Sequence, residues 1–167
     1  MYRLGRLTLA VTLGALLAAC HPSTPTASTG SNTATTSGPA KLAATADENT
    51  WGNYLAEQVK LHSKDVAMHP SMYVIPAGDS VTANARRQNE TDSMVHSIGP
   101  ILMPGGMLIV GGPDPKQTPT FLGDVAKQLK ADVLKGIVVM VVSDASEQPA
   151  VASALRASSA TVRFVAM

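Results

Sequence analysis

The chain has 167 residues, 13 lysines and arginines, 12 aspartates and glutamates, and a single cysteine. One cysteine excludes an intramolecular disulfide, so a folded domain must be held together by its core alone. The charge is close to neutral and forms no basic stripe, so we expect no nucleic-acid partner.

The first residues have the pattern of a secretory signal peptide. Arg3 and Arg6 give a positive start, a short apolar run follows from residue 7 to 17, and small residues precede Cys20. The apolar run is shorter than the about 20 residues that a membrane-spanning helix needs. We therefore expect residues 1–19 to be removed on export.

The tetrad Leu17-Ala18-Ala19-Cys20 resembles the lipobox of bacterial lipoproteins. The resemblance implies cleavage before Cys20 and attachment of lipid to the thiol and the amine of that cysteine. It also implies a location in the bacterial cell envelope. Because His21 and not an aspartate follows the cysteine, the outer membrane, facing the periplasm, is the expected site.

Residues 20–46 are expected to be a flexible tether. They are rich in Ser, Thr, Ala, Pro and Gly, and this composition buries too little apolar surface to offset the entropy of the chain. The remaining residues, 47–167, have a suitable length for one domain.

Strand patterns and helix patterns alternate through this domain. A helix is expected to start at residues 47–50, with Trp51, Leu55 and Val59 on one face. The segments that follow are expected as a strand at 71–77, a helix at 80–98, a strand at 106–111, a helix at 118–134 capped by Thr118, a strand at 136–143, a helix at 146–158 and a strand at 161–167. The alternation predicts a small three-layer α/β domain with a mainly parallel sheet of about four strands, preceded by a helix.

Two strands carry a further prediction about position. The segment at 136–143 is apolar on both faces, which predicts a central strand that is covered on both sides. The last strand runs up to Met167, which we expect to lie at or near the sheet.

The expected helix at 80–98 is polar almost all round. One interpretation is a solvated helix with ion pairs such as Arg86–Glu90. The other is a surface that faces a partner, because a helix with so weak an apolar face gains little from the core.

The carboxyl ends of parallel strands meet at one edge of a sheet, where ligands commonly bind. Turn residues follow three of the expected strands there, and we call this set the rim: Asp79, Ser80, Gly111, Gly112, Asp114 and Asp144. The three aspartates could hold a divalent cation or a small ligand. Caps and tight turns between strands and helices need the same residue types, so we assign no metal and no cofactor.

Gly78-Asp79-Ser80 resembles the first motif of the GDS-type (SGNH) esterases and lipases. The resemblance implies that Ser80 is a nucleophile. A serine needs a base to take its proton, and the family supplies one from a histidine near the C-terminus. No histidine follows His96 in this chain, so Ser80 is only a weak catalytic candidate and Asp79 or Ser80 is the expected helix cap.

The leading hypothesis is an envelope lipoprotein, anchored by lipid on Cys20, whose domain is not an enzyme and binds another envelope or exported protein. It would act as an assembly accessory or as an inhibitor. The alternatives are a small serine hydrolase that uses Ser80 and a cation or small-ligand binder at the rim.

Overall fold

A computed structural model of the chain describes residues 38–167. The predicted signal peptide, the lipidation site Cys20 and the tether up to residue 37 lie outside the described residues. Within residues 38–167, no helix is both long enough and apolar enough to cross a membrane.

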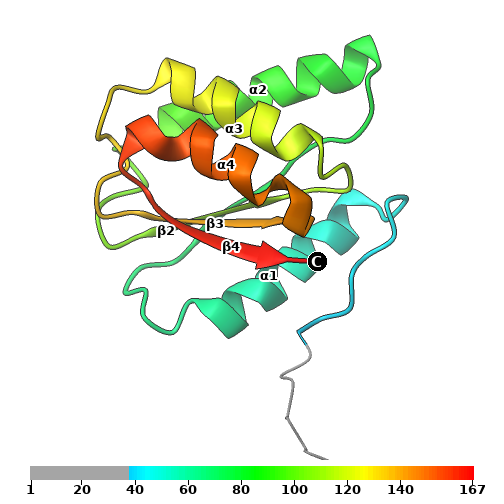
Figure 1. The fold of residues 1–167 in the computed structure, drawn as a ribbon, viewed down its shortest axis with the longest axis horizontal. Coiled ribbons are helices and arrows are strands. Elements are labelled where there is room, and N and C mark those ends of the chain that lie inside the picture. The colour runs from blue at the N-terminus through cyan, green and yellow to red at the C-terminus, as the bar shows by residue number, and fades with distance from the viewer. Residues whose placement is uncertain (1–37) are drawn as a thin grey trace, which may run out of the picture. The chain divides into compact units, whose positions relative to one another are not determined.

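The domain consists of three layers, with one parallel sheet in the middle (Figure 1). The strands are β1 (Ser71–Val74), β2 (Met107–Gly111), β3 (Val138–Ser143) and β4 (Thr161–Ala166). Helix α1 (Glu48–His62) lies on one face of the sheet. The other face carries α2 (Val81–Ser97), α3 (Gln117–Gln128) and α4 (Gln148–Leu155). Short 3-10 turns at Ala145–Glu147 and Arg156–Ser158 flank α4. The predicted three-layer α/β domain is confirmed, and all four strands are parallel.

The strands lie in the same order in space as in the chain, β1-β2-β3-β4. Each crossover therefore moves by one strand in the same direction. Because parallel crossovers keep one handedness, all three crossover helices lie on the same face of the sheet. Helix α1 precedes β1 and is the only helix on the opposite face of the described domain, where it packs on β1 and β2.

Two apolar cores fill the space on the two sides of the sheet. The larger core lies under α2, α3 and α4 and contains Leu108, Val110 and Val141. The smaller core lies under α1, where Trp51 packs edge to face against Tyr54 and both lie near Ile109 and Met140 of the sheet. Strand β3 contributes to both cores, so the prediction of a central strand covered on both sides is confirmed.

The starts of α1 and α2 match the predicted caps. The carboxylate of Asp47 accepts the Thr50 N–H at 2.8 Å, and this hydrogen bond holds the pKa of Asp47 below its usual value. The hydroxyl of Ser80 accepts the Ala83 N–H at 3.1 Å in the same way. Both residues have the extended backbone that an N-cap requires.

Helix α3 differs from its prediction at both ends. It begins after Lys116, so Thr118 is not the cap but a fully buried residue of the first turn. It also ends at Gln128, because the next residues turn to meet a loop that is distant in the sequence. The N–H of Asp132 donates to the Ala157 carbonyl, and the N–H of Leu134 donates to the Ser158 carbonyl.

The described part of the predicted tether, residues 38–46, packs on the domain. Leu42 and Ala46 contact the core under α1, and the hydroxyl of Tyr54 donates to the Pro39 carbonyl at 3.5 Å. Lys41 forms an ion pair with Asp144. The packed region therefore starts earlier than the predicted boundary at residue 47, because Leu42 and Ala46 anchor this segment to the core under α1.

Candidate functional site

The structure brings the rim loops next to one another but gives each aspartate its own partner. Asp79 accepts from the side-chain amide of Gln117 at 3.0 Å, and Asp114 accepts from the Lys116 N–H at 3.1 Å. Asp144 is paired with Lys41. No group of three or more His, Cys, Asp or Glu side chains within residues 38–167 is arranged to hold a metal ion.

The two rim glycines are explained by close packing. A Cβ atom on Gly112 would lie 2.5 Å from the carbonyl oxygen of Ile75, and one on Gly111 would lie 2.9 Å from the carbonyl oxygen of Val142. Glycine is thus needed where the chain leaving β2 passes close to the end of β1 and to β3. This requirement accounts for both glycines without an anion.

Ser80 is a cap and has no histidine beside it. His96 lies near the far end of α2, about 24 Å from Ser80 along the helix axis. Within residues 38–167 the Ser80 hydroxyl accepts from the Ala83 N–H and forms no hydrogen bond with a histidine. The arrangement gives the Ser80 hydroxyl a structural role at the start of α2.

The strand order also removes the reason to expect a cleft at the rim. Parallel sheets form a ligand crevice where the direction of the crossovers reverses. At that point the loops that leave two neighbouring strands run to opposite faces of the sheet and leave a gap between them. The order β1-β2-β3-β4 contains no reversal. The rim of the described domain therefore has no crevice of this topological kind, and the loops after β1 and β2 line only a small hollow of about 240 Å³, with Pro76, Ala77 and Pro113 in its wall.

The polar surface of α2 is exposed along its first half, where none of the residues from 81 to 90 is buried. Arg86 pairs with Glu48 of α1 at 2.5 Å, so the predicted ion pair with Glu90 is wrong. The reason is tertiary, since the start of α1 lies close to the start of α2. Whether this surface faces a partner stays a prediction.

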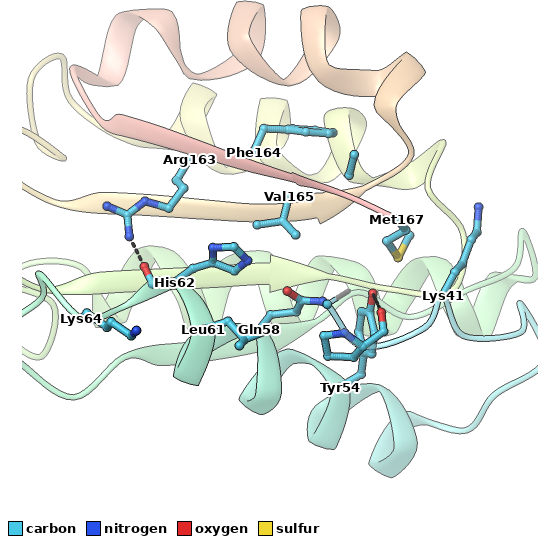
Figure 2. Close-up of a pocket in the computed structure, with 13 residues that line it drawn as sticks. Lys41, Tyr54, Gln58, Leu61, His62, Lys64, Arg163, Phe164, Val165 and Met167 are labelled. Atoms are coloured by element: carbon cyan, nitrogen blue, oxygen red, sulfur yellow. Dashed lines mark hydrogen bonds between the residues drawn. The ribbon is translucent and has the colours of Figure 1, made fainter. Parts of the chain in front are cut away.

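The largest hollow described lies between α1 and β4, and Figure 2 shows it in close-up. We call it the β4 groove. It has a volume of about 720 Å³, and its walls include Tyr54, Gln58 and Leu61 from α1 and Arg163, Val165 and Met167 from the end of the chain. It exists because α1 packs on β1 and β2, which leaves the β4 side of this face uncovered by a helix in the described domain.

Ion pairs and hydrogen bonds close the two ends of the groove. At one end the Arg163 guanidinium binds the Asp65 carboxylate with two hydrogen bonds, at 2.7 and 3.1 Å, and also donates to the carbonyl of His62. The hydrogen bonds lower the pKa of Asp65 and raise that of Arg163. At the other end, Lys41 reaches Asp144 and Pro39 accepts from Tyr54.

The groove is basic at its ends and apolar in its middle. Lys41, His62, Lys64 and Arg163 line it, and its lining contains no acidic side chain. Leu61, Val165 and Met167 lie between the basic residues (Figure 2). Gln58 is 3% exposed, and its Oε1 atom has no hydrogen-bond partner within the described residues.

The outer edge of β4 adjoins this groove and carries free backbone groups. The N–H groups of Thr161 and Met167 donate to the carbonyls of Ile137 and Ser143 on the β3 side. Because backbone groups alternate along a strand, those of Val162, Phe164 and Ala166 point away from β3. Within residues 38–167 no hydrogen bond reaches these three outward positions.

The β4 groove was not predicted from the sequence. One signal was available, because the segment from 161 to 166 contains neither proline nor lysine, the residues that commonly protect an edge strand. The groove itself joins residues about a hundred positions apart, such as His62 and Arg163, and no local pattern predicts such a contact.

Comparison with family models finds no match to this sequence, and no curated protein or solved structure matches it either.

Proposed function

We propose that this chain is a lipid-anchored protein of the bacterial cell envelope whose α/β domain binds another envelope or exported protein. The lipobox resemblance at residues 17–20 supports the anchor, through lipid on Cys20 and with the outer membrane as its place. The domain binds its partner at the outer edge of β4 and the adjoining β4 groove, and it acts as an assembly accessory or an inhibitor.

The open edge of β4 is the observation that carries the binding proposal. A strand with unpaired N–H and C=O groups is a template for another strand, and proteins normally shorten it, charge it or cover it. Here the edge is six residues long, and Val162 is 37% exposed. Its one charged residue, Arg163, lines the groove and is paired with Asp65. An edge of this kind beside a groove is the arrangement used when a protein captures an extended segment of a partner.

The structure gives the two alternatives no comparable support. A serine hydrolase would need a base within hydrogen-bonding distance of Ser80. The Ser80 hydroxyl instead accepts a helix N–H, and no histidine of the described residues lies beside it. A cation site at the rim would need its aspartates to share one centre, and each of them has a separate partner.

Site-specific photo-crosslinking in intact cells tests the binding site. We would place a photo-reactive residue at Val162 on the β4 edge and, as a matched control, at Met72 on the β1 edge, which is 44% exposed. We expect one adduct of defined mass from Val162 and none from Met72. Adducts of equal yield from both positions, or none from either, would contradict the proposal.

The anchor has its own test. Replacement of Cys20 by serine is expected to abolish both lipid attachment and cleavage before residue 20, so the variant should take up no labelled palmitate and should keep its signal peptide. Mass spectrometry of the membrane-bound protein is expected to show an acylated N-terminal cysteine. An unmodified Cys20 in the mature protein would contradict the lipoprotein assignment.

A further inference from the structure

We propose that the partner contributes an extended acidic segment that adds to the sheet as a fifth strand beside β4 and places carboxylates at the two ends of the β4 groove. This inference rests on the proposed function and names the chemistry of the partner. It follows from the backbone, the charges and the shape of the site.

The backbone of β4 requires an extended occupant. The outward N–H and C=O groups occur at Val162, Phe164 and Ala166, so they repeat at about 6.7 Å, which is two residues of a strand. Another extended backbone presents complementary groups at the same repeat, whereas a helix satisfies its own groups internally. An acyl chain has no hydrogen-bonding groups at all and would leave the three positions unpaired.

The charges of the groove select an acidic segment. Its lining has Lys64 and Arg163 at one end and Lys41 at the other, with no carboxylate between them. Lys41 and Arg163 already have acidic partners, whereas Lys64 is exposed and forms no ion pair within residues 38–167. An acidic group in the partner gains mainly from Lys64 and shares Lys41 and Arg163 with their present partners, whereas a basic segment would be repelled.

The shape of the groove sets the order of the side chains. Alternate residues of a strand face the same side, as Arg163, Val165 and Met167 do on β4 (Figure 2). Three residues of an added strand would therefore face the groove. The outer two lie near the basic ends and the middle one lies over Leu61 and Val165, which favours the pattern acidic, any residue, apolar, any residue, acidic.

Gln58 places a hydrogen-bond acceptor, unpaired within residues 38–167, in the wall of the groove. Its side chain extends from α1 toward the sheet, and its Oε1 atom is an acceptor without a donor in the described residues. A buried acceptor of this kind is stabilised when a partner brings an N–H or O–H group to it.

The pattern reads the same in both directions, so one probe tests parallel and antiparallel addition together. The probe is the capped peptide Thr-Glu-Thr-Leu-Thr-Glu-Thr, and the control peptide has Lys in place of both Glu residues. Binding to the full-length protein in detergent micelles is measured by NMR titration at low salt. We expect the Glu peptide to bind about tenfold more tightly than the Lys peptide, because the Lys peptide brings like charges beside Lys64.

Two variants of the protein locate the charge effect. Lys64→Glu is expected to remove or reverse the preference for the Glu peptide. Lys130→Glu changes an exposed lysine beyond the end of α3, away from the groove, and is expected to leave the preference unchanged. Equal effects of the two variants would overturn the role of the groove.

Backbone methylation of the peptide tests strand addition directly. N-methyl groups on alternate residues remove the donors of one edge of the peptide, and two such peptides cover the two edges. We expect one of them to lose at least about tenfold in affinity and the other to lose much less, since only one edge faces β4. Equal binding of all the peptides, or binding by none, would overturn the inference.

The outcomes separate this inference from the proposed function. If Val162 gives a protein adduct in cells but the Glu peptide shows no preference, the protein-binding function stands and the acidic strand is rejected. If Val162 gives no adduct, the binding function itself fails. An adduct with twice the mass of the chain would assign the edge to a second copy and would contradict both.

Discussion

The two edges of the sheet are built differently. Strand β1 has four residues and lies between Pro70 and Pro76, whereas β4 has six residues and contains neither proline nor lysine. Pro76 has no N–H to offer at the β1 edge, and its carbonyl accepts from Arg87 of α2 at 2.8 Å. The β1 edge is thus protected against pairing by several means, while the β4 edge is open.

The contrast indicates that the two edges were shaped by different requirements. Protection at β1 is what an isolated domain needs in order to stay monomeric and soluble. An open edge beside a basic groove at β4 is what a strand-binding site needs. We therefore expect the most damaging substitution where β1 ends and smaller effects near β4.

The largest effect is expected where β1 and β2 end together. Gly112→Ala would place a Cβ atom 2.5 Å from the Ile75 carbonyl oxygen, and a backbone atom cannot move aside easily. We expect a loss of about 3 kcal/mol in the free energy of unfolding, measured with urea. Gly123→Ala in α3 is the matched control, because its Cβ would meet nothing within 4 Å, and it should stabilise the protein by about 0.5 kcal/mol.

A smaller effect is expected at the end of β4. Met167 is half-buried against the core under α1, and its N–H donates to the Ser143 carbonyl at 3.1 Å. Met167→Ala should reduce the free energy of unfolding by about 1 kcal/mol, since a partly buried side chain loses only part of its contacts.

A fusion placed directly at Met167 should also lower the melting temperature. The same fusion attached through a long Gly-Ser linker is its control. A melting temperature that is unchanged by the direct fusion would contradict the packing of this residue.

Ser80 holds the start of the helix that protects β1. Ser80→Ala removes the side-chain acceptor for the Ala83 N–H, and we expect a loss of about 1 kcal/mol. Ser80→Asp keeps an acceptor and should retain most of the stability. An esterase activity that disappears in Ser80→Ala would show instead that this serine acts as a nucleophile.

The smallest effect is expected at Asp65, and it depends on pH. Hydrogen bonds from Arg163 lower the pKa of Asp65 below the ordinary value of 3.8. The folded state therefore favours the charged form, so the ion pair stabilises the protein above that value and ceases to do so as the pH falls through the lowered pKa. Because Asp65 is exposed, the contribution is small.

The measurement compares the melting temperatures of the wild type and Asp65→Asn over a range of pH. The variant should melt slightly lower near about pH 7, and the two curves should converge in acid as the pH falls through the lowered pKa of Asp65. Glu57→Gln, an exposed residue of α1 outside every ion pair of the described residues, is the control and should show no such convergence. A difference that persists in acid would mean that Asp65 acts through packing.

The elements were predictable because their signals are local. Trp51, Leu55 and Val59 share one face of α1, the apolar residues 138–142 mark a central strand, and Asp47 and Ser80 cap the helices that they precede. Where a contact with a distant loop competed with the local pattern, prediction failed. Helix α3 ends early because the segment after it pairs with residues 157 and 158.

The rim and the groove also differ in how far local sequence signals could predict them. Sequence placed Asp79, Gly112 and Asp144 at one edge of the sheet, since each follows a strand, but not their separate hydrogen-bond partners. The β4 groove required the position of α1 over β1 and β2, which the amphipathic pattern of α1 does not specify. An apolar face indicates that a helix covers something, without naming the strands beneath it.

The sequence by itself determined the parallel α/β class and the caps of α1 and α2, because periodicity, turn residues and caps act between neighbours in the chain. Only the tertiary structure decided the order β1-β2-β3-β4, the one-sided position of α1 and the open edge of β4. These features depend on which apolar surfaces meet, and that choice is made by packing between segments far apart in the sequence.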